Sequence, residues 1–367
     1  MSSIRQTRVY IILILFILLG IGVVMIYSSS SIYAWNSMGD SLFYLKRHLV
    51  YLFFGFILMF LAMAIDHQLL KKIAKPLFIF SLLLLFLSFV PGFSHQASGA
   101  KRWIRIGSFG FQPSELIKIT FIIYLADYIS RRKDIINNFY YGLLPALVAL
   151  AVPMFVILLQ PDLGTAIALA SVAAIMLFCA GLSYFYFIVG ILTSLPALYF
   201  LVFSIAYRRA RILAFLNPWA DPKGSGFQII QSQIALGSGG LFGQGLGQGK
   251  QKLFYLPAAH TDFIFSVISE EMGIIGAIAV TLLFIFLIWQ MIRIARFSND
   301  DFFRFLSIGI ISLISLQTVI NIGVSIGMFP TKGLPLPFIS YGGSSLIFDM
   351  AAMGLLLNTS RKSDIYL

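Results

Sequence analysis

Long apolar runs dominate this chain, and short stretches rich in charge, glycine or proline separate them. A helix needs about 20 mostly apolar residues to cross a bilayer. Runs of about this length lie near residues 9–27, 49–65, 76–91, 114–129, 143–159, 163–181, 184–206, 266–292, 303–328 and 345–359. The ten-residue alternation of outer-membrane barrels is not found. The pattern predicts an all-α polytopic membrane protein with about ten transmembrane helices.

Composition agrees with this fold class. The chain is 59% hydrophobic and 11% charged, and its mean hydropathy is +0.92, far outside the range of soluble globular proteins. The first apolar run is too long for the core of a signal peptide, so we interpret it as a retained first span. The sequence shows no linker and no repeat, and we expect one membrane domain over residues 1–367.

Lysines and arginines in short loops predict the orientation. One side collects most of them: Arg5, Arg8, Lys71, Lys72, Lys75, Arg131, Arg132, Lys133, Arg293, Arg296, Arg304, Arg361 and Lys362. The short loops of the other side hold Lys46, Arg47, Lys101, Arg102, Arg105 and Lys332. Because cytoplasmic loops are enriched in these residues, both termini are predicted to be cytoplasmic. The long segment at about residues 207–265 is then extracytoplasmic.

This extracytoplasmic segment is too long for an ordinary connection. Its ILAFL and FQIIQSQIAL runs are amphipathic, which favours short helices at the membrane surface. Glycines are dense between Gly224 and Gly249, but the phosphate-binding Walker pattern fails because Gln251 follows Gly249-Lys250. We therefore expect tight turns there, and no nucleotide or other organic cofactor.

The net charge of +12 has two sources. The cytoplasmic loops account for about half of it, whereas the positive charges outside suit an anionic ligand such as a phosphate-bearing lipid. The basic residues form no continuous patch, which argues against nucleic acid. The single cysteine, Cys179, and four scattered histidines give no disulfide framework, thiol metal site or zinc site.

Four charged residues lie near predicted outer helix ends. Glu115 and Lys118 are three residues apart and share one helix face. They form either an internal ion pair or a cavity lining in which Lys118 meets a negative group. Arg47 and Arg102 either bind an anion or anchor the chain at the interface, where Trp103 would lie beside Arg102.

A carboxylate, Asp262, stands in the HTDF block just before the eighth predicted span. It either caps that helix together with Thr261 or, with His260, serves a catalytic site. A charge near hydrocarbon needs such a role, because an unpaired buried carboxylate costs several kcal/mol. Glu270 and Glu271 follow within about two turns and would suit core ion pairs.

One block identifies a family. The stretch NIGVSIGMFPTKGLPLPFISYGGSS, residues 321–345, resembles the signature of the SEDS family (shape, elongation, division and sporulation), which includes FtsW, RodA and SpoVE. The blocks KRHLVYLFFG, FQPSELIKI, LLQPDLGTA, NPWADPKGSGFQIIQS, GSGGLFGQGLGQ and HTDFIFSVISEE are similar to the family as well. They cover the chain almost end to end, and GQGKQKLFYLPAAHTDF favours the FtsW-like branch over RodA.

The resemblance implies a peptidoglycan glycosyltransferase that polymerises lipid II on the outer face of the bacterial cytoplasmic membrane. It implies that Asp262 is the essential carboxylate, acting as general base in an inverting single displacement. It also implies a class B penicillin-binding transpeptidase as partner. By this resemblance and by position, the residues expected to line the cavity or bind the pyrophosphate are Lys118, Glu115, Arg102, Arg47, His260, Thr261, Lys332 and Ser344.

Some interpretations stay open. A Mg²⁺ or Mn²⁺ ion could assist the departing pyrophosphate, but relatives carry a glutamate where this chain has Ala258. Ser344 or Ser345 would either cap the tenth span or help bind an anion. A lipid II flippase and a non-catalytic scaffold for the transpeptidase remain alternative functions.

Overall fold

The computed structural model describes residues 2–91, 94–97, 100–106, 109–253, 256–257, 259–331 and 333–363. Ten long helices follow the predicted spans: α1 (Ser2–Met38), α2 (Phe43–Ala64), α3 (His67–Leu87), α4 (Pro113–Arg132), α5 (Leu144–Leu159), α6 (Leu163–Cys179), α7 (Tyr184–Phe203), α10 (Ile264–Phe297), α11 (Asp301–Ser325) and α12 (Gly343–Ser363). The prediction of an all-α polytopic membrane protein is confirmed.

Six apolar helical stretches of the described chain are long enough to cross a membrane: Ile4–Met38, Phe43–Ala64, Phe139–Leu159, Tyr184–Phe203, Ile264–Phe297 and Asp301–Ser325. The Phe139–Leu159 stretch combines α5 with a π-helical turn, η2 (Phe139–Leu143). The helix α3 begins well before the predicted run 76–91, because the Asp66 carboxylate accepts hydrogen bonds from the backbone N–H groups of Gln68 and Leu69. This cap starts the helix in a polar turn that a search for apolar residues overlooks.

The long segment at about residues 207–265 contains the two predicted short helices, α8 (Ala206–Leu216) and α9 (Phe227–Ser238). Short 3₁₀ turns, η1 (Lys133–Ile135) and η3 (Pro218–Ala220), follow α4 and α8. The apolar pattern did not predict a small antiparallel sheet, β1 (Ser94–Ala97), β2 (Ala100–Ile106) and β3 (Phe109–Phe111), between α3 and α4.

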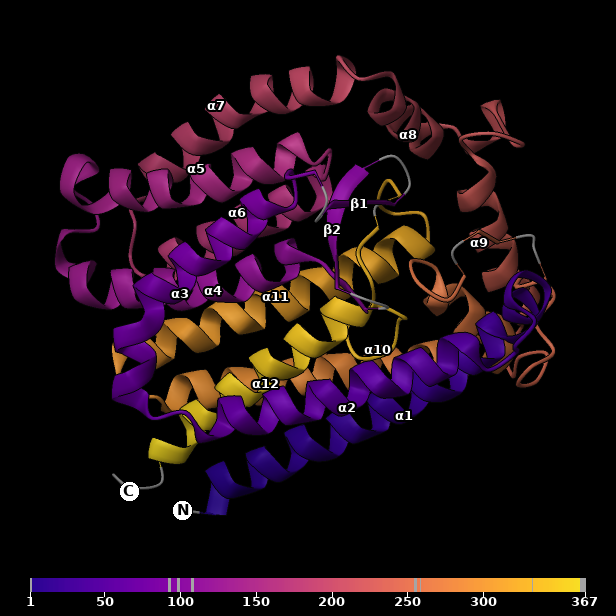
Figure 1. Cartoon of the computed structure of the whole chain (residues 1–367), viewed down its shortest axis with the longest axis horizontal. Coiled ribbons are helices and arrows are strands. Elements are labelled where there is room, and N and C mark those ends of the chain that lie inside the picture. Colours follow the sequence, from indigo (N-terminus) through magenta and orange to yellow (C-terminus); the bar gives the residue numbers. More distant parts are fainter. Residues whose placement is uncertain are drawn as a thin grey trace.

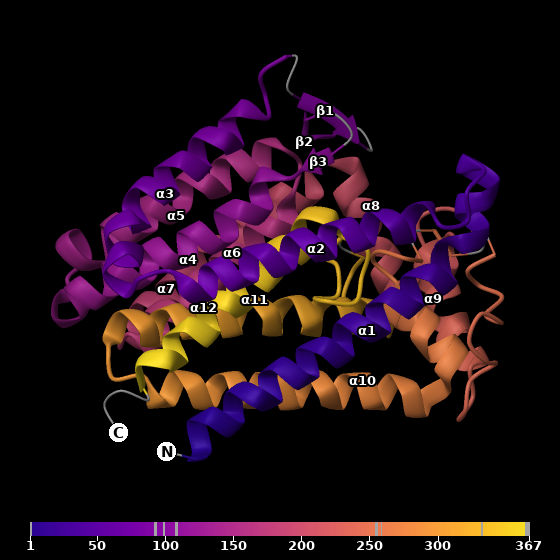
Figure 2. The same ribbon diagram turned by 60° about the horizontal axis from the view of Figure 1, so that its bottom comes forward.

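The start of α1 and the end of α12 lie near each other at one end of the helix bundle (Figure 1). The sheet, α8 and α9 lie toward the opposite end, as the turned view also shows (Figure 2). The start of α1 and the end of α12 thus lie at the end of the bundle opposite to α8 and α9 (Figure 1 and Figure 2). Which of these ends faces the cytoplasm stays a prediction from the loop charges.

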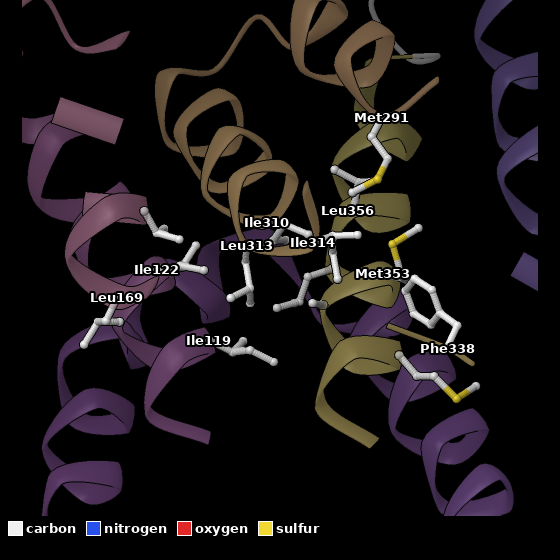
Figure 3. Packing of buried hydrophobic residues seen from close by; sticks show 14 of the residues in the cluster. Ile119, Ile122, Leu169, Met291, Ile310, Leu313, Ile314, Phe338, Met353 and Leu356 are labelled. Carbon is white, nitrogen blue, oxygen red and sulfur yellow. The ribbon is translucent and has the colours of Figure 1, made fainter. Parts of the chain in front are cut away.

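The core is centred on α11, which contributes Ile310, Leu313 and Ile314. Figure 3 shows these side chains between those of α4 and α6 on one flank and those of α10 and α12 on the other. Their burial makes α11 a central helix, and its last turns carry the first residue of the 321–345 signature, Asn321.

The helix α10 breaks at Gly273, whose φ is +71°. The glycine-rich loop between α9 and α10 fills the break: its Gln244 and Gly245 N–H groups donate to the carbonyl oxygens of Glu270 and Glu271, both at 3.0 Å. The loop glycines Gly240, Gly243, Gly245 and Gly247 all have positive φ, as expected for tight turns.

Buried charges hold the same loop. Lys252 donates to the Glu271 carboxylate at 2.6 Å, and the Ser28 hydroxyl donates to it at 2.7 Å. Glu270 accepts from the backbone N–H of Lys250 at 2.7 Å. The expectation that Glu270 and Glu271 form buried ion pairs is therefore confirmed for Glu271, which pairs with Lys252. Glu270 instead accepts hydrogen bonds from backbone N–H groups of the loop.

Replacing Gly243 with alanine should destabilise the protein strongly. A Cβ at Gly243 would collide with the backbone of Glu271 and Gly273, and φ there is +83°. Gly247 has nearly the same φ, +82°, but open space around it, so Gly247→Ala carries only the strain of a left-handed backbone, about 1–2 kcal/mol. Thermal unfolding should show a much larger loss for Gly243→Ala. Equal losses would mean that the close approach does not matter.

Candidate functional site around Asp262

Three consecutive backbone carbonyls fix the HTDF block to the signature segment. The oxygen of His260 accepts from the Tyr341 N–H at 2.9 Å. The oxygen of Thr261 accepts from the Ser340 hydroxyl at 2.6 Å, and that of Asp262 accepts from the Asn321 amide at 3.0 Å. The signature segment thus fixes the backbone of residues 260–262, which carries the Asp262 side chain.

Asn321 joins three parts of this site. Its side-chain amide also donates to the carbonyl of Leu334 at 2.8 Å, so one buried residue of α11 binds both the HTDF block and the proline-rich loop before α12. Ser340 adds a second link, because its hydroxyl accepts from the Leu336 N–H at 2.9 Å. These buried hydrogen bonds hold the HTDF backbone more rigidly than a free loop would.

The Asp262 carboxylate does not cap α10. The residue at the cap position is Phe263, which makes no side-chain cap. Asp262 as a whole residue is partly buried, and the signature loop passes close to its carboxylate, since a Cβ on Gly333 would lie 3.4 Å from Oδ2. The capping interpretation is therefore wrong, and the carboxylate remains available for chemistry.

Burial raises the pKa of Asp262 to about 6, although the Arg211 guanidinium and a hydrogen bond from Thr261 both lower it. Arg211 lies on α8, donates to the carbonyl of Thr331 at 3.1 Å, and stacks over the Tyr207 ring at 4.5 Å. The site thus combines an ionisable carboxylate with a fixed guanidinium. A carboxyl group of this pKa is ionised at neutral pH and basic enough to accept a proton.

Aromatic rings surround His260. Its ring centroid lies 4.7 Å from that of Tyr44 and 5.7 Å from that of Tyr341, and burial lowers its pKa to about 4. The imidazole is therefore neutral at pH 7. Arg47 stacks over the Phe43 ring at 4.5 Å and hydrogen bonds to Tyr341. The structure thus links Arg47 to His260 through Tyr341, beside Asp262.

Glu115 and Lys118 form a second polar cluster, in the helical core. Their ion pair measures 2.8 Å, with side chains only 6% and 2% exposed. Asp349 of α12 is a second carboxylate close to the ammonium group of Lys118. The ion-pair interpretation is confirmed, and the pair extends to a residue of α12.

Arg102 binds a loop instead of lying free. Its Nε donates to the carbonyl of Gln160 at 2.8 Å and its terminal nitrogen donates to that of Pro161 at 2.7 Å. Another guanidinium nitrogen lies 3.9 Å from the Asp162 carboxylate. Arg102 thereby attaches the sheet to the turn between α5 and α6.

Ser344, another of the predicted site residues, contacts protein groups in the structure. The Ser344 hydroxyl accepts from the Gln112 N–H at 3.0 Å and donates to the Gly110 carbonyl at 3.4 Å, so it connects α12 to the start of α4. The Ser345 hydroxyl donates to the Gly342 carbonyl at 3.0 Å. Lys332 lies outside the described residues, as does Ala258.

Sequence reasoning missed Arg211, Asp349 and Tyr341 as contributors. Arg211 directly precedes the ILAFL run, which indicated only a short amphipathic helix at the membrane surface. The charge of Asp349 inside an apolar span was the signal for a buried partner, because ionisable groups in such spans usually pair with one another.

The side chains near Asp262 do not resemble a metal site. No group of three or more His, Cys, Asp or Glu side chains is placed to hold a metal ion in the described part of the chain. The residues around Asp262 thus provide one carboxylate and one guanidinium, which do not make a metal-ligand set.

Sequence comparison covers nearly the whole chain. The profile of the cell cycle protein family FtsW/RodA/SpoVE matches residues 8–365. The probable peptidoglycan glycosyltransferase FtsW of Geobacter sulfurreducens is 48% identical over 361 residues, which are 98% of this chain and 97% of that protein. Stage V sporulation protein E of Bacillus subtilis is 44% identical over 353 residues, 96% of each chain.

Solved structures agree with these relatives. A chain from a study of how a peptidoglycan synthase complex coordinates polymerization and crosslinking superposes with a TM-score of 0.79 at 32% identity, covering 96% of this chain and 97% of that one. The rod shape determining protein RodA of Thermus thermophilus superposes with a TM-score of 0.71 at 30% identity, covering 96% of each. The chain therefore belongs to the FtsW/RodA/SpoVE family of polytopic membrane proteins and resembles FtsW.

Proposed function

We propose that this protein is a peptidoglycan glycosyltransferase that polymerises lipid II, with Asp262 as its general base. The observation that carries the proposal is the fixation of three consecutive carbonyls, at His260, Thr261 and Asp262, by the family signature. With the backbone held in this way, the Asp262 carboxylate does not cap α10 and remains near Arg211, on a residue that is partly buried. The names of full-length relatives support the same reaction.

The chemistry needs one base and positive charge. The Asp262 carboxylate takes the proton of the acceptor sugar 4-hydroxyl while its oxygen attacks the anomeric carbon of the donor. The bond from that carbon to the pyrophosphate breaks with inversion, and the undecaprenyl diphosphate leaves with its electron pair. A neutralised pyrophosphate departs without a second carboxyl acid, unlike the leaving group of a glycosidase.

Among the cations of the described residues, Arg211 is best placed to stabilise the departing pyrophosphate, because it is close enough to lower the pKa of Asp262. Its planar guanidinium suits phosphate oxygens. Lys118 lies in a buried ion pair, Arg47 stacks on an aromatic ring and Arg102 binds the turn between α5 and α6. Their contribution is to hold the surrounding helices and loops, so we assign them positioning roles. Arg211 also binds protein groups, but it is the cation whose charge acts on Asp262.

The setting follows from the topology. The protein lies in the bacterial cytoplasmic membrane with both termini in the cytoplasm, so that Asp262 meets lipid II on the outer face. Its partner is a class B penicillin-binding transpeptidase. The similarity to a chain of a peptidoglycan synthase complex that coordinates polymerization with crosslinking supports this partner.

A reconstitution experiment separates the three candidate functions. Purified protein, with and without a transpeptidase partner, is placed in vesicles containing lipid II, and both glycan product and headgroup crossing are measured. Polymer formation by protein whose Asp262 is intact is the expected result. Headgroup crossing without polymer would favour a flippase, and neither activity would favour a scaffold.

The pH dependence of the rate tests the ionisation of Asp262. Because the base acts in its ionised form and its pKa is about 6, the rate should fall about tenfold as the pH decreases from 7 to 5. Arg211→Gln removes a positive charge that lowers this pKa, so the fall should begin at higher pH. An acid limb that stays at the same pH in Arg211→Gln would show that the two groups do not interact.

A further inference from the structure

The glycine-rich loop before α10 carries an exposed apolar surface. Leu241, Phe242 and Leu246 are 62%, 81% and 59% exposed, although the loop backbone is firmly bound to α10. We propose that this surface, the 241–246 wedge, inserts into the outer leaflet of the membrane beside α10. The proposal concerns lipid contact and does not depend on the reaction at Asp262.

The position of the wedge along α10 supports insertion. Residues 272–292 carry no charge, whereas Glu271 and Arg293 flank them. A stretch of this length matches the hydrocarbon thickness of a bilayer, which about 20 helical residues span. The break at Gly273 therefore lies at the outer edge of the hydrocarbon, and the wedge lies at the same level.

The hydrogen bonds at the break give a physical reason for this depth. The N–H groups of Ile274 and Ile275 donate to the carbonyls of Gly240 and Leu241 at 2.9 and 3.3 Å. At the edge of the hydrocarbon, water cannot reliably satisfy a broken helix, so another segment must. The loop backbone does so, and this brings the side chains of Leu241 and Phe242 to the membrane.

The wedge also continues the lipid-facing surface of α10. Between Gly273 and Arg293, the large apolar side chains exposed on that helix are Ile274, Ile275, Ile278, Leu282, Ile285 and Trp289. Leu241 is bonded through its carbonyl to Ile275, the second of this series. An apolar surface that adjoins a lipid-facing helix face has lipid as its natural partner, since burial removes the apolar area of Leu and Phe side chains from water.

Insertion would set the height of the extracytoplasmic segment above the bilayer. The far end of the loop is held by Glu270 through the Lys250 N–H, and α9 is held at its middle by a 2.7 Å hydrogen bond between Ser232 and Ser266. The wedge, α9 and the start of α10 are thus bound into one rigid unit. Insertion of the wedge into the membrane would fix the height of this unit above the bilayer.

Nitroxide accessibility tests the wedge directly. The chain has one cysteine, so Cys179→Ser provides a background for single probes at Phe242→Cys and Leu246→Cys. Leu282→Cys serves as the lipid-facing reference and Lys223→Cys, on an exposed turn before α9, as the aqueous reference. Each variant is reconstituted in phosphatidylglycerol–phosphatidylethanolamine nanodiscs and exposed to oxygen or to a water-soluble nickel complex.

The expected result is that the probes at Phe242 and Leu246 collide with oxygen more often than with nickel, as at Leu282. Nickel accessibility equal to that at Lys223 would overturn the proposal. Shielding from both reagents would overturn it as well, since protein would then cover the wedge. Two probe sites keep the test valid if one variant fails to fold.

Discussion

Asp262→Asn is expected to reduce lipid II polymerisation by about 10²–10⁴-fold, the usual contribution of a general base. Asparagine has nearly the same shape but cannot accept the proton of the acceptor hydroxyl. The fold should survive, because the hydrogen bond from Asn321 reaches the backbone carbonyl of residue 262 and not its side chain. The measurement is product formation from lipid II at equal folded yield.

The matched control is Asp40→Asn. Asp40 is also a carboxylate outside the predicted spans, but it is exposed and pairs with Lys46 at 2.7 Å. Its loss should leave the polymerisation rate within about twofold, the range of ordinary surface changes. Equal activity in Asp262→Asn and wild type would remove Asp262 from the catalytic role.

Lys118→Met should cause the largest loss of stability. The change leaves the buried carboxyl groups of Glu115 and Asp349 without their cation. Removal of one partner from a buried ion pair costs about 3–5 kcal/mol, so the melting temperature in detergent should fall markedly. Lys46→Met, which breaks an exposed pair of similar length, should leave the melting temperature unchanged.

A second variant separates stability from function. In Glu115→Gln combined with Lys118→Met, fewer carboxyl groups are left without a cation, so the melting temperature should recover in part. If Lys118 only positions helices, polymerisation should recover with it. A stable double variant that makes no glycan would instead show that Lys118 contacts the substrate.

The helices were predictable because each depends on a local property, the length of an apolar run. The predicted ion pair between Glu115 and Lys118 is local too, since helix geometry alone brings residues three apart together. The break in α10 was not predictable, because Gly273 lies within an apolar run. The break depends on backbone hydrogen bonds between α10 and the glycine-rich loop before it, which an apolar pattern does not show.

The candidate site was predictable in its centre and not in its surroundings. The HTDF block and the signature were evident as motifs, but their connection runs through Asn321, Ser340 and Tyr341 across at least 59 residues of sequence. Arg211 approaches Asp262 from α8, which no spacing along the chain indicates. Tertiary packing decides such contacts.

The most direct test of the central claim is the pH–rate profile of lipid II polymerisation for wild type and Asp262→Asn, measured across about two pH units on the acid side of neutrality. The account predicts an acid limb near pH 6 in wild type and a small residual rate without that limb in the variant. A variant that keeps both a substantial rate and the limb would contradict the account, because another group would then be the base.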